Sequence, residues 1–302
     1  NNFQITVDGS ELDINTSLTT NGIGIISQFT PVITNVTIES GTYSIGDQVT
    51  VLVSVQDDNG NTFTYHAGTV AGKELESLER VSSTLYSGIF TVQAGDQSYT
   101  STQIIPVSNL QLAFESQVSS PYSGSISNGT VIDAGQPVIN YMQAPSGVKK
   151  VGDLVDIIVS ADGSGYTAVD LQTRVNNVPL SNANVSFIEL GSGVYILRYV
   201  VAEGDDDVSP GSLTASLQLE DAVGNLSEVK TTLTSNTTTI DANSPKVTTI
   251  TVDDEVYNIG DVIQVDIIAD GSNYSATNET TINGVPLSSS AVTFSNVSGN
   301  QY

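Results

Sequence analysis

The chain has 302 residues, of which 38% are hydrophobic, enough apolar material for two or three domains with cores of their own. Its formal net charge of −25 would repel the phosphate backbone of nucleic acids and anionic membrane surfaces. Cysteine and tryptophan are absent and His66 is the only histidine, so thiol chemistry, Cys/His zinc sites and histidine-based triads are excluded. We therefore expect a folded protein that is not an enzyme, binds no nucleic acid and does not insert into a membrane.

A repeat of about a hundred residues organises the sequence, and its copies begin at Pro31, Pro137 and Pro245. In each copy the glycine of a Gly-Asp pair follows fifteen residues after the proline. One tyrosine position is shared by all three copies, at Tyr86, Tyr195 and Tyr302. Because self-similarity at a fixed period indicates repeated structural units, the predicted segments are 1–30, 31–136, 137–244 and 245–302.

Apolar and polar residues alternate along the repeat, as in the four valines at 49, 51, 53 and 55. No window keeps a helical period over three turns. About seven short strands recur in each hundred residues between turns rich in Gly, Asn and Asp, a pattern typical of a β-sandwich. The sequence therefore predicts an all-β chain of tandem immunoglobulin-like β-sandwiches. The charged run Lys73–Arg80 is interpreted as a solvated face or a short helical turn.

The two ends of the chain carry unequal parts of the repeat. Residues 1–30 align with 215–244, which places Phe3, Ile5 and Leu12 opposite Leu217, Leu219 and Leu226. Residues 245–302 supply only the first strands. Two explanations are open: a fragment cut from a longer repeat protein, or a polymer subunit whose residues 1–30 add strands to the next copy. The first is favoured, because the equivalent of 195–214 is present only through Tyr302.

The repeat resembles the Ig-like repeats of large bacterial cell-surface adhesins and of bacterial and archaeal S-layer proteins. The residues that carry the resemblance are Tyr43-Ser44-Ile45-Gly46-Asp47, Tyr257-Asn258-Ile259-Gly260-Asp261 and Asp221-Ala222-Val223-Gly224-Asn225. The middle repeat departs from it with Val148 in place of the tyrosine, and the first repeat lacks a clear Asp-x-x-Gly-Asn turn.

The resemblance implies an extracellular, cell-surface protein that is structural: a segment of an adhesin stalk, an S-layer or a filament. Its partners would be copies of itself or adjacent repeats of the same surface protein. The alternative is an adhesin module that binds a glycan or a surface ligand, with 97–130 as the most distinctive segment. A glycoside-active enzyme is a third option, and it would need paired carboxylates in a deep cleft.

Acidic residues gather where the repeats would meet and in nearby turns. Ca²⁺ prefers six to eight oxygen ligands, which converging carboxylates can supply. We therefore predict Ca²⁺ as a cofactor, with ligands among Asp133, Asp205, Asp206, Asp207, Asp241, Asn243, Asp253 and Asp254. The alternative is that these residues occupy turns because their side chains accept local backbone hydrogen bonds, and that their charges are solvated.

Nine asparagines precede x-Ser/Thr and are candidate glycosylation sites. The alternative is a β surface that is simply rich in asparagine and threonine. The nine are Asn15, Asn35, Asn128, Asn184, Asn225, Asn236, Asn273, Asn278 and Asn296.

Overall fold

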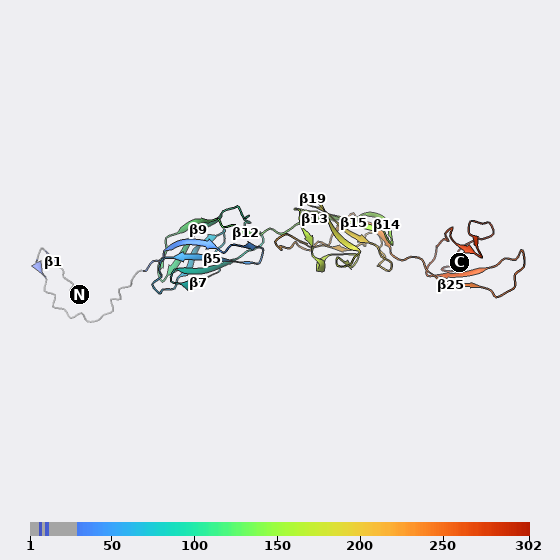
Figure 1. Cartoon of the computed structure of the whole chain (residues 1–302), viewed down its shortest axis with the longest axis horizontal. Helices are drawn as coiled ribbons and strands as arrows, with labels where there is room; N and C mark the ends of the chain where they lie inside the picture. The colour runs from blue at the N-terminus through green and yellow to red at the C-terminus, as the bar shows by residue number, and fades with distance from the viewer. Residues whose placement is uncertain (1–5, 8–9, 12–28) are drawn as a thin grey trace. The chain divides into compact units, whose positions relative to one another are not determined.

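The computed structural model describes residues 6–7, 10–11 and 29–302, and in this part of the chain the only helix is one 3-10 turn, Asp170–Gln172. All other regular elements are strands, so the prediction of an all-β fold is confirmed. The chain divides into two compact units, Asn1–Asp133 and Ala134–Tyr302 (Figure 1). None of the described residues form a helix long and apolar enough to cross a membrane.

The first unit is an Ig-like sandwich of two main antiparallel sheets. One sheet has the strand order β3-β5-β8-β7, and in the other β9 pairs with β6, β10 and β11. A short parallel pair joins β12 to β4. The strands are β3 (Ile33–Ile38), β4 (Thr42–Tyr43), β5 (Gln48–Val55), β6 (Thr64–Val70), β7 (Ser77–Ser82), β8 (Leu85–Thr91), β9 (Ile105–Phe114), β10 (Gln117–Val118), β11 (Tyr122–Ile126) and β12 (Val131–Ile132).

Alternation of side chains along β5 decides which face of that strand is buried. Val49, Val51, Val53 and Val55 point into the core, and the residues between them are partly exposed. This is the period-two pattern of a strand with one face on a core. The charged run Lys73–Arg80 continues into β7 and forms no helical turn. The prediction of a helical turn was therefore wrong.

The middle repeat, within the second unit, has the same architecture. One sheet has the order β19-β20-β15-β13-β23, and further pairs join β14 to β24, β16 to β22, and β17 to both β18 and β21. The strands are β13 (Ile139–Gln143), β14 (Ser146–Lys150), β15 (Leu154–Ala161), β16 (Thr167–Ala168), β17 (Arg174–Val175), β18 (Val178–Pro179), β19 (Val185–Gly191), β20 (Val194–Val200), β21 (Ala215–Ser216), β22 (Leu219–Glu220), β23 (Leu233–Thr234) and β24 (Thr237–Asp241). Its buried core cluster lies entirely between Ile139 and Ala242.

Short strand pairs make up the remaining described structure. In the last segment β25 (Val247–Val252) pairs with β26 (Val265–Ala269), and β27 (Thr281–Ile282) pairs with β28 (Val285–Pro286). Near the N-terminus β1 (Thr6–Val7) pairs with β2 (Ser10–Glu11).

The repeated Gly-Asp pair builds one tight turn in all three repeats. The glycines at 46, 152 and 260 have φ of +95°, +88° and +100°, a region that side chains with a Cβ rarely adopt. The following aspartate accepts a hydrogen bond from the backbone N–H three residues before it, at 2.7 Å for Asp47, 2.8 Å for Asp153 and 2.6 Å for Asp261. The turn thus needs both residue types, which explains why the pair recurs.

Candidate functional site

The tyrosine shared by the three repeats is a buried anchor between strands. Its hydroxyl oxygen accepts a hydrogen bond from a backbone N–H earlier in the same repeat: Phe63 to Tyr86 at 3.1 Å, Tyr166 to Tyr195 at 3.2 Å, and Tyr274 to Tyr302 at 2.9 Å. In the middle and last repeats the ring also stacks on an equivalent phenylalanine, Phe187 or Phe294, with centroid distances of 5.0 and 5.2 Å. Tyr86 instead stacks on Phe63, the residue that donates the N–H, at 5.2 Å. The three repeats therefore share one internal scaffold.

Residues 245–302 reproduce two hydrogen bonds of an aspartate in the first part of the middle repeat. Asp270 Oδ1 accepts from the Lys246 N–H at 3.0 Å and from the Tyr274 hydroxyl at 3.1 Å. In the middle repeat Asp162 Oδ1 accepts from the Val138 N–H at 2.8 Å and from the Tyr166 hydroxyl at 3.2 Å.

Burial, followed by the nearby Asp162 charge, raises the pKa of Tyr166 to about 12. The Lys246 N–H lowers the pKa of Asp270. Both aspartates accept from the same pair of donors, so this corner is built in the same way in the middle repeat and the last segment.

Several apolar side chains of the last segment are exposed at positions that are buried in the middle repeat. Ile250, Ile263 and Ile282 are 62%, 49% and 38% exposed, whereas the equivalent Met142, Val155 and Val175 of the middle repeat are all 0% exposed. We define the open face by the side chains of Ile250, Ile263, Val265, Ile282 and Phe294, which line a groove of about 580 Å³.

The middle repeat shows which residues cover the equivalent surface. Its core cluster includes Leu197, Leu213, Leu217, Leu219 and Ile240, all of which follow Tyr195 in the sequence. Tyr302 is the equivalent of Tyr195 in the last segment. The open face thus corresponds to the surface that residues 196–244 cover in the middle repeat.

The predicted calcium ligands lie in turns, where backbone N–H groups occupy several of their oxygens. Asp207 Oδ1 accepts from the Ala242 N–H at 2.8 Å and from the Asn243 amide at 2.9 Å. Asp205 Oδ2 accepts from the Ala202 N–H at 2.8 Å and from the Tyr199 hydroxyl at 2.5 Å. These contacts are those expected if the aspartates occupy turns and accept local backbone hydrogen bonds, which is the alternative to calcium binding.

The other predicted ligands are dispersed. Asp206 accepts from the Asn177 amide at 3.3 Å, and Asp241 accepts weakly from the Asn243 N–H at 3.5 Å. Asp253 and Asp254 are exposed after β25, and Asp133 belongs to the first unit. Among the described residues, no three acidic or histidine side chains are grouped so that they could hold a metal ion. Calcium binding stays a prediction, without a preformed set of ligands to support it.

The sequon asparagines fall into two groups by environment. The side-chain amide of Asn128 donates to the Ile38 carbonyl at 2.7 Å, and that of Asn236 donates to the Leu213 carbonyl at 2.9 Å. Asn225 is buried and donates to Asp221, Asn184 is half-buried, and Asn296 donates to the Gly299 carbonyl at 2.9 Å. By whole-residue exposure, Asn35, Asn128, Asn273, Asn278 and Asn296 are exposed, Asn184 and Asn236 are half-buried, and Asn15 lies outside the described residues.

An ion pair in the first repeat, between the buried Asp58 and the partly exposed Arg80, was missed by the sequence reasoning, which interpreted the run containing Arg80 as a solvated face or helical turn. Asp58 is fully buried and accepts from Arg80 Nε at 2.6 Å, from Arg80 Nη2 at 2.9 Å and from the Tyr86 hydroxyl at 3.0 Å. The guanidinium lowers the pKa of this carboxyl to about 2. The pair joins the turn before β6 to β7 and to the buried tyrosine.

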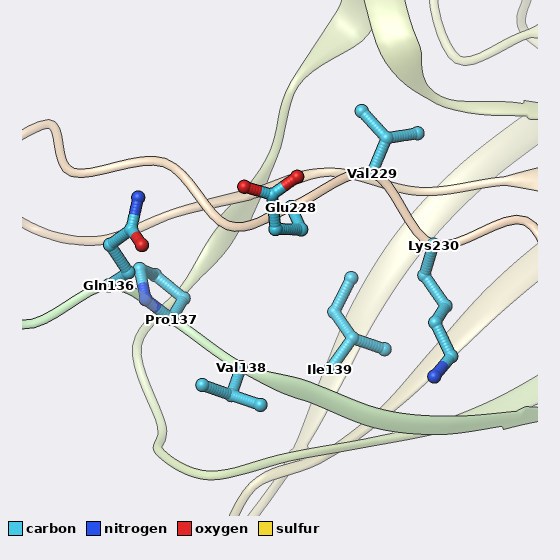
Figure 2. A pocket seen from close by; sticks show the side chains of 7 residues that line it. All are labelled: Gln136, Pro137, Val138, Ile139, Glu228, Val229 and Lys230. Atoms are coloured by element: carbon cyan, nitrogen blue, oxygen red, sulfur yellow. The ribbon is translucent and has the colours of Figure 1, made fainter.

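A small pocket of about 200 Å³ lies in the middle repeat, beside the first residues of β13. Figure 2 shows Ile139 and Val229 on its sides, with the polar ends of Gln136, Glu228 and Lys230 around them. The Lys230 ammonium donates to the Asn140 carbonyl at 3.4 Å, and the Gln136 amide donates to the Leu226 carbonyl at 3.2 Å. The pocket exists because β23 pairs only with Met142 and Gln143, which leaves the start of β13 without a neighbour on that side.

Comparison with known proteins adds structural neighbours and no family. No protein-family model and no curated protein matches the chain. Among solved structures, an I-band fragment of titin is 11% identical, with 82% of this chain and 78% of that chain covered and a TM-score of 0.38.

Two further neighbours are modules of adhesion and receptor proteins. The N-terminal Ig module of the Drosophila receptor protein tyrosine phosphatase DLAR is 15% identical, covering 70% of this chain and all of that one, with a TM-score of 0.21. The eight N-terminal Ig domains of Down Syndrome Cell Adhesion Molecule are 15% identical, covering 90% of this chain and 36% of that one, with a TM-score of 0.30. With these low sequence identities and TM-scores, the similarity supports no inference about function. The Ig-like architecture is inferred from the sheets described above.

Proposed function

We propose that this chain is a structural segment of an extracellular assembly on a cell surface, an adhesin stalk, an S-layer or a filament, and that it is not an enzyme. The observation that carries the proposal is the recurrence of one scaffold, anchored by Tyr86, Tyr195 and Tyr302. Repeated sandwiches with separate cores suit an extended structural role, because each contributes length without depending on distant parts of the chain. The net charge of −25 opposes nonspecific adhesion to anionic surfaces.

Electron microscopy of cells that produce the protein tests this proposal. With gold-labelled antibodies against the full chain, we expect label on the outer surface, over a lattice, fibres or stalks. Brief protease treatment of intact cells should remove the label. Label confined to the cell interior, unchanged by the protease, would overturn the proposal.

The second candidate function is a glycan- or surface-binding adhesin module, and the pocket beside β13 gives it a location. Apolar walls with a few polar groups at the rim are common in ligand sites, although this one is smaller than most. Binding of the full chain to a glycan array, lost in Lys230→Ala and kept in the distant Lys149→Ala, would support this candidate. An array without any bound glycan would contradict it.

Glycosylation belongs to the same proposal and should follow side-chain accessibility. Among the described residues, the exposed sequon asparagines are Asn35, Asn128, Asn273, Asn278 and Asn296, whereas Asn225 is buried. We therefore expect glycopeptides of the native protein to carry glycan at some or all of the exposed five. Occupancy at Asn225 with none at the exposed five would contradict this expectation.

A further inference from the structure

We propose that the outward face of the sheet β19-β20-β15-β13-β23, in the middle repeat, binds the same face of a second copy of this chain. This inference rests on the proposed function, because it describes how copies would join within an assembly. Three features of the middle repeat carry it. They are an apolar patch on this face, an ion pair that complements itself across a two-fold axis, and a groove on the β13 side.

Apolar side chains cover the centre of this face in two rows. They alternate along β15 and β20 with the buried side chains of the core, and they therefore point outward. In one row Leu154 lies opposite Val200. In the other, Ile158 lies opposite Ile196, which lies opposite Ile188 of β19. Leu154 and Ile158 are 43% and 42% exposed, and the other three are half-buried. We call these five residues the outer patch.

The first repeat shows that the fold does not require this patch. In its sheet β3-β5-β8-β7, Gln48 lies opposite Thr91, and Leu52 lies opposite Ser87. Glu79 of β7 is the other neighbour of Ser87. These positions are equivalent to those of the outer patch, and four of the five residues are polar. The apolar side chains of the outer patch are therefore dispensable for the sheet itself, and their burial against a partner would stabilise a complex.

An ion pair separates the two apolar rows. Asp156 on β15 lies opposite Arg198 on β20, and Arg198 Nε and Nη2 donate to its two carboxylate oxygens at 2.7 and 2.8 Å. These hydrogen bonds lower the pKa of Asp156, so both groups are charged at neutral pH. The two side chains are 33% and 32% exposed, which leaves them open to charges on a partner.

The order of these residues fits a copy of the same face. A two-fold axis parallel to the strands, between β15 and β20, would place Asp156 of each copy over Arg198 of the other. The same axis would place Ile158 over Ile196. An axis at right angles to the strands would instead place Asp156 over Asp156, and repulsion between like charges opposes that arrangement. Charge complementarity therefore selects the first axis, and a two-fold contact of this kind closes to a dimer.

Net charge makes this face the favourable one for self-association. The chain carries a formal charge of −25, so most contacts between two copies would bring acidic groups together. At the centre of this face each copy presents one carboxylate and one guanidinium, and the axis along the strands pairs each with its opposite.

A groove on the β13 side provides shape complementarity to the same arrangement. Because β19 and β13 flank the central strands β20 and β15, the axis carries β19 of one copy over β13 of the other. Gln143 of β13 lies opposite Ile158, so Ile188 of the second copy would lie over Gln143. There the surface has a groove of about 360 Å³, lined by Gln143, Pro145, Ile158 and Thr237 among others. The Ile188 side chain would enter this groove, and close packing of this kind is typical of specific interfaces.

Sedimentation velocity of the full chain over a range of concentrations tests the contact. We expect the natural chain to pass from monomer to dimer as its concentration rises. Ile158→Ser/Ile196→Ser should raise the Kd of the dimer by about tenfold or more, since both side chains lie at the centre of the contact. The matched control is Leu52→Ser/Ile89→Ser, which changes two outward apolar residues in the equivalent sheet of the first repeat. It should leave the Kd unchanged, and melting curves check that both variants are folded.

Charge variants test the axis without removing apolar surface. Asp156→Lys and Arg198→Glu should each give a monomer, because each places like charges over one another. An equimolar mixture of the two should form dimers that contain one copy of each variant, identified by native mass spectrometry. The double variant Asp156→Arg/Arg198→Asp keeps both the internal pair and its complement on the second copy, and it should dimerise as the natural chain does.

Four results would each overturn the proposal. They are a natural chain that is monomeric at every concentration, a dimer unaffected by Ile158→Ser/Ile196→Ser, an equal loss in the first-repeat control, and a mixture of the charge variants that stays monomeric. A monomeric natural chain would leave the outer patch to a different protein. Each of these results leaves the proposed surface role intact, because that role is tested by the location of the native protein.

Discussion

Asp58 is the residue whose charge state matters most to the first repeat, because it is buried and bonded to Arg80 and Tyr86. Its pKa is lowered from 3.8 to about 2, which means that the ionised carboxylate is more stable in the folded state than in the unfolded chain. The resulting stability is fully present above about pH 4 and is lost as the pH falls through about 2. We expect the melting temperature of the first repeat in the full chain to fall across this window.

The variant Asp58→Asn should remove this dependence. It leaves the Arg80 guanidinium without its anion, and we expect the melting temperature of the first repeat at pH 7 to fall by on the order of 10 °C. Differential scanning calorimetry of the full chain, between pH 2 and pH 7, makes the measurement. Asp57→Asn is the control, because Asp57 accepts only the Asn59 N–H in an exposed turn. If both variants keep the same pH dependence as the natural chain, Asp58 is not its source.

At the scale of elements, β6 lies against the backbone of β9 at Gly68. A Cβ there would lie 2.3 Å from the Asn109 carbonyl oxygen, and Gly68 has a φ of +96°. The ladder between these strands shifts register on both sides of Ala67, so the backbone bulges where the glycine lies. The absence of a side chain thus permits both the conformation and the contact.

Two alanine variants separate these effects. Gly46 has nearly the same φ, +95°, but an added Cβ would have no atom within 4 Å. Gly46→Ala should therefore cost only the conformational term, about 1 kcal/mol. Gly68→Ala should cost about 2 to 4 kcal/mol in total, because the strands must also move apart. Equal losses in the free energy of unfolding, measured by guanidinium titration of the full chain, would contradict the role of close approach.

Strands and turns were predictable from the sequence because their signals are local. Alternation in β5 and the Gly-Asp turns involve residues within a few positions of one another. The pairing of Asp58 with Arg80 was not predictable, because the two residues are 22 positions apart. They meet only in the folded sheet, where β7 pairs with β8. Likewise, the sequence placed Asp205 and Asp207 in turns but could not show which donors their oxygens would accept.

Accessibility was equally invisible in the sequence. Asn225 and Asn278 satisfy the same sequon, yet one is buried beside Asp221 and the other is exposed. The repeat aligned Ile250 and Ile282 with Met142 and Val175 of the middle repeat. That the first two are exposed and the second two buried required the structure, because exposure depends on how neighbouring strands pack.

At the scale of the whole molecule, the net charge of −25 is what a bound cation would partly neutralise. Calcium binding to the folded form should raise its melting temperature, and at a free concentration ten times the Kd the gain is about 1.4 kcal/mol. We expect the transition of the second unit, which carries Asp205, Asp206, Asp207 and Asp241, to shift upward in millimolar Ca²⁺ and back with chelator. Sodium chloride at equal ionic strength controls for screening. Superimposable curves, with no metal found by elemental analysis, would contradict calcium binding.

The middle repeat should fold without the rest of the chain. Its buried core cluster lies entirely between Ile139 and Ala242, so a fragment of residues 137–244 keeps every side chain of that cluster. Among the described ion pairs, the cut breaks the one between Lys246 and Glu203, at 3.5 Å, and both side chains are well exposed. Exposed pairs of this kind contribute about 0 to 1 kcal/mol, so the melting temperature of the fragment should lie within about 5 °C of its transition in the full chain. Circular dichroism should show a β-type spectrum and one cooperative transition.

A fragment ending at 214 is the control: it lacks Leu217, Leu219 and Ile240 from the core, and we expect it to be unfolded. A disordered spectrum for 137–244, or equal stability of the two fragments, would mean that the repeat boundaries do not delimit a folding unit.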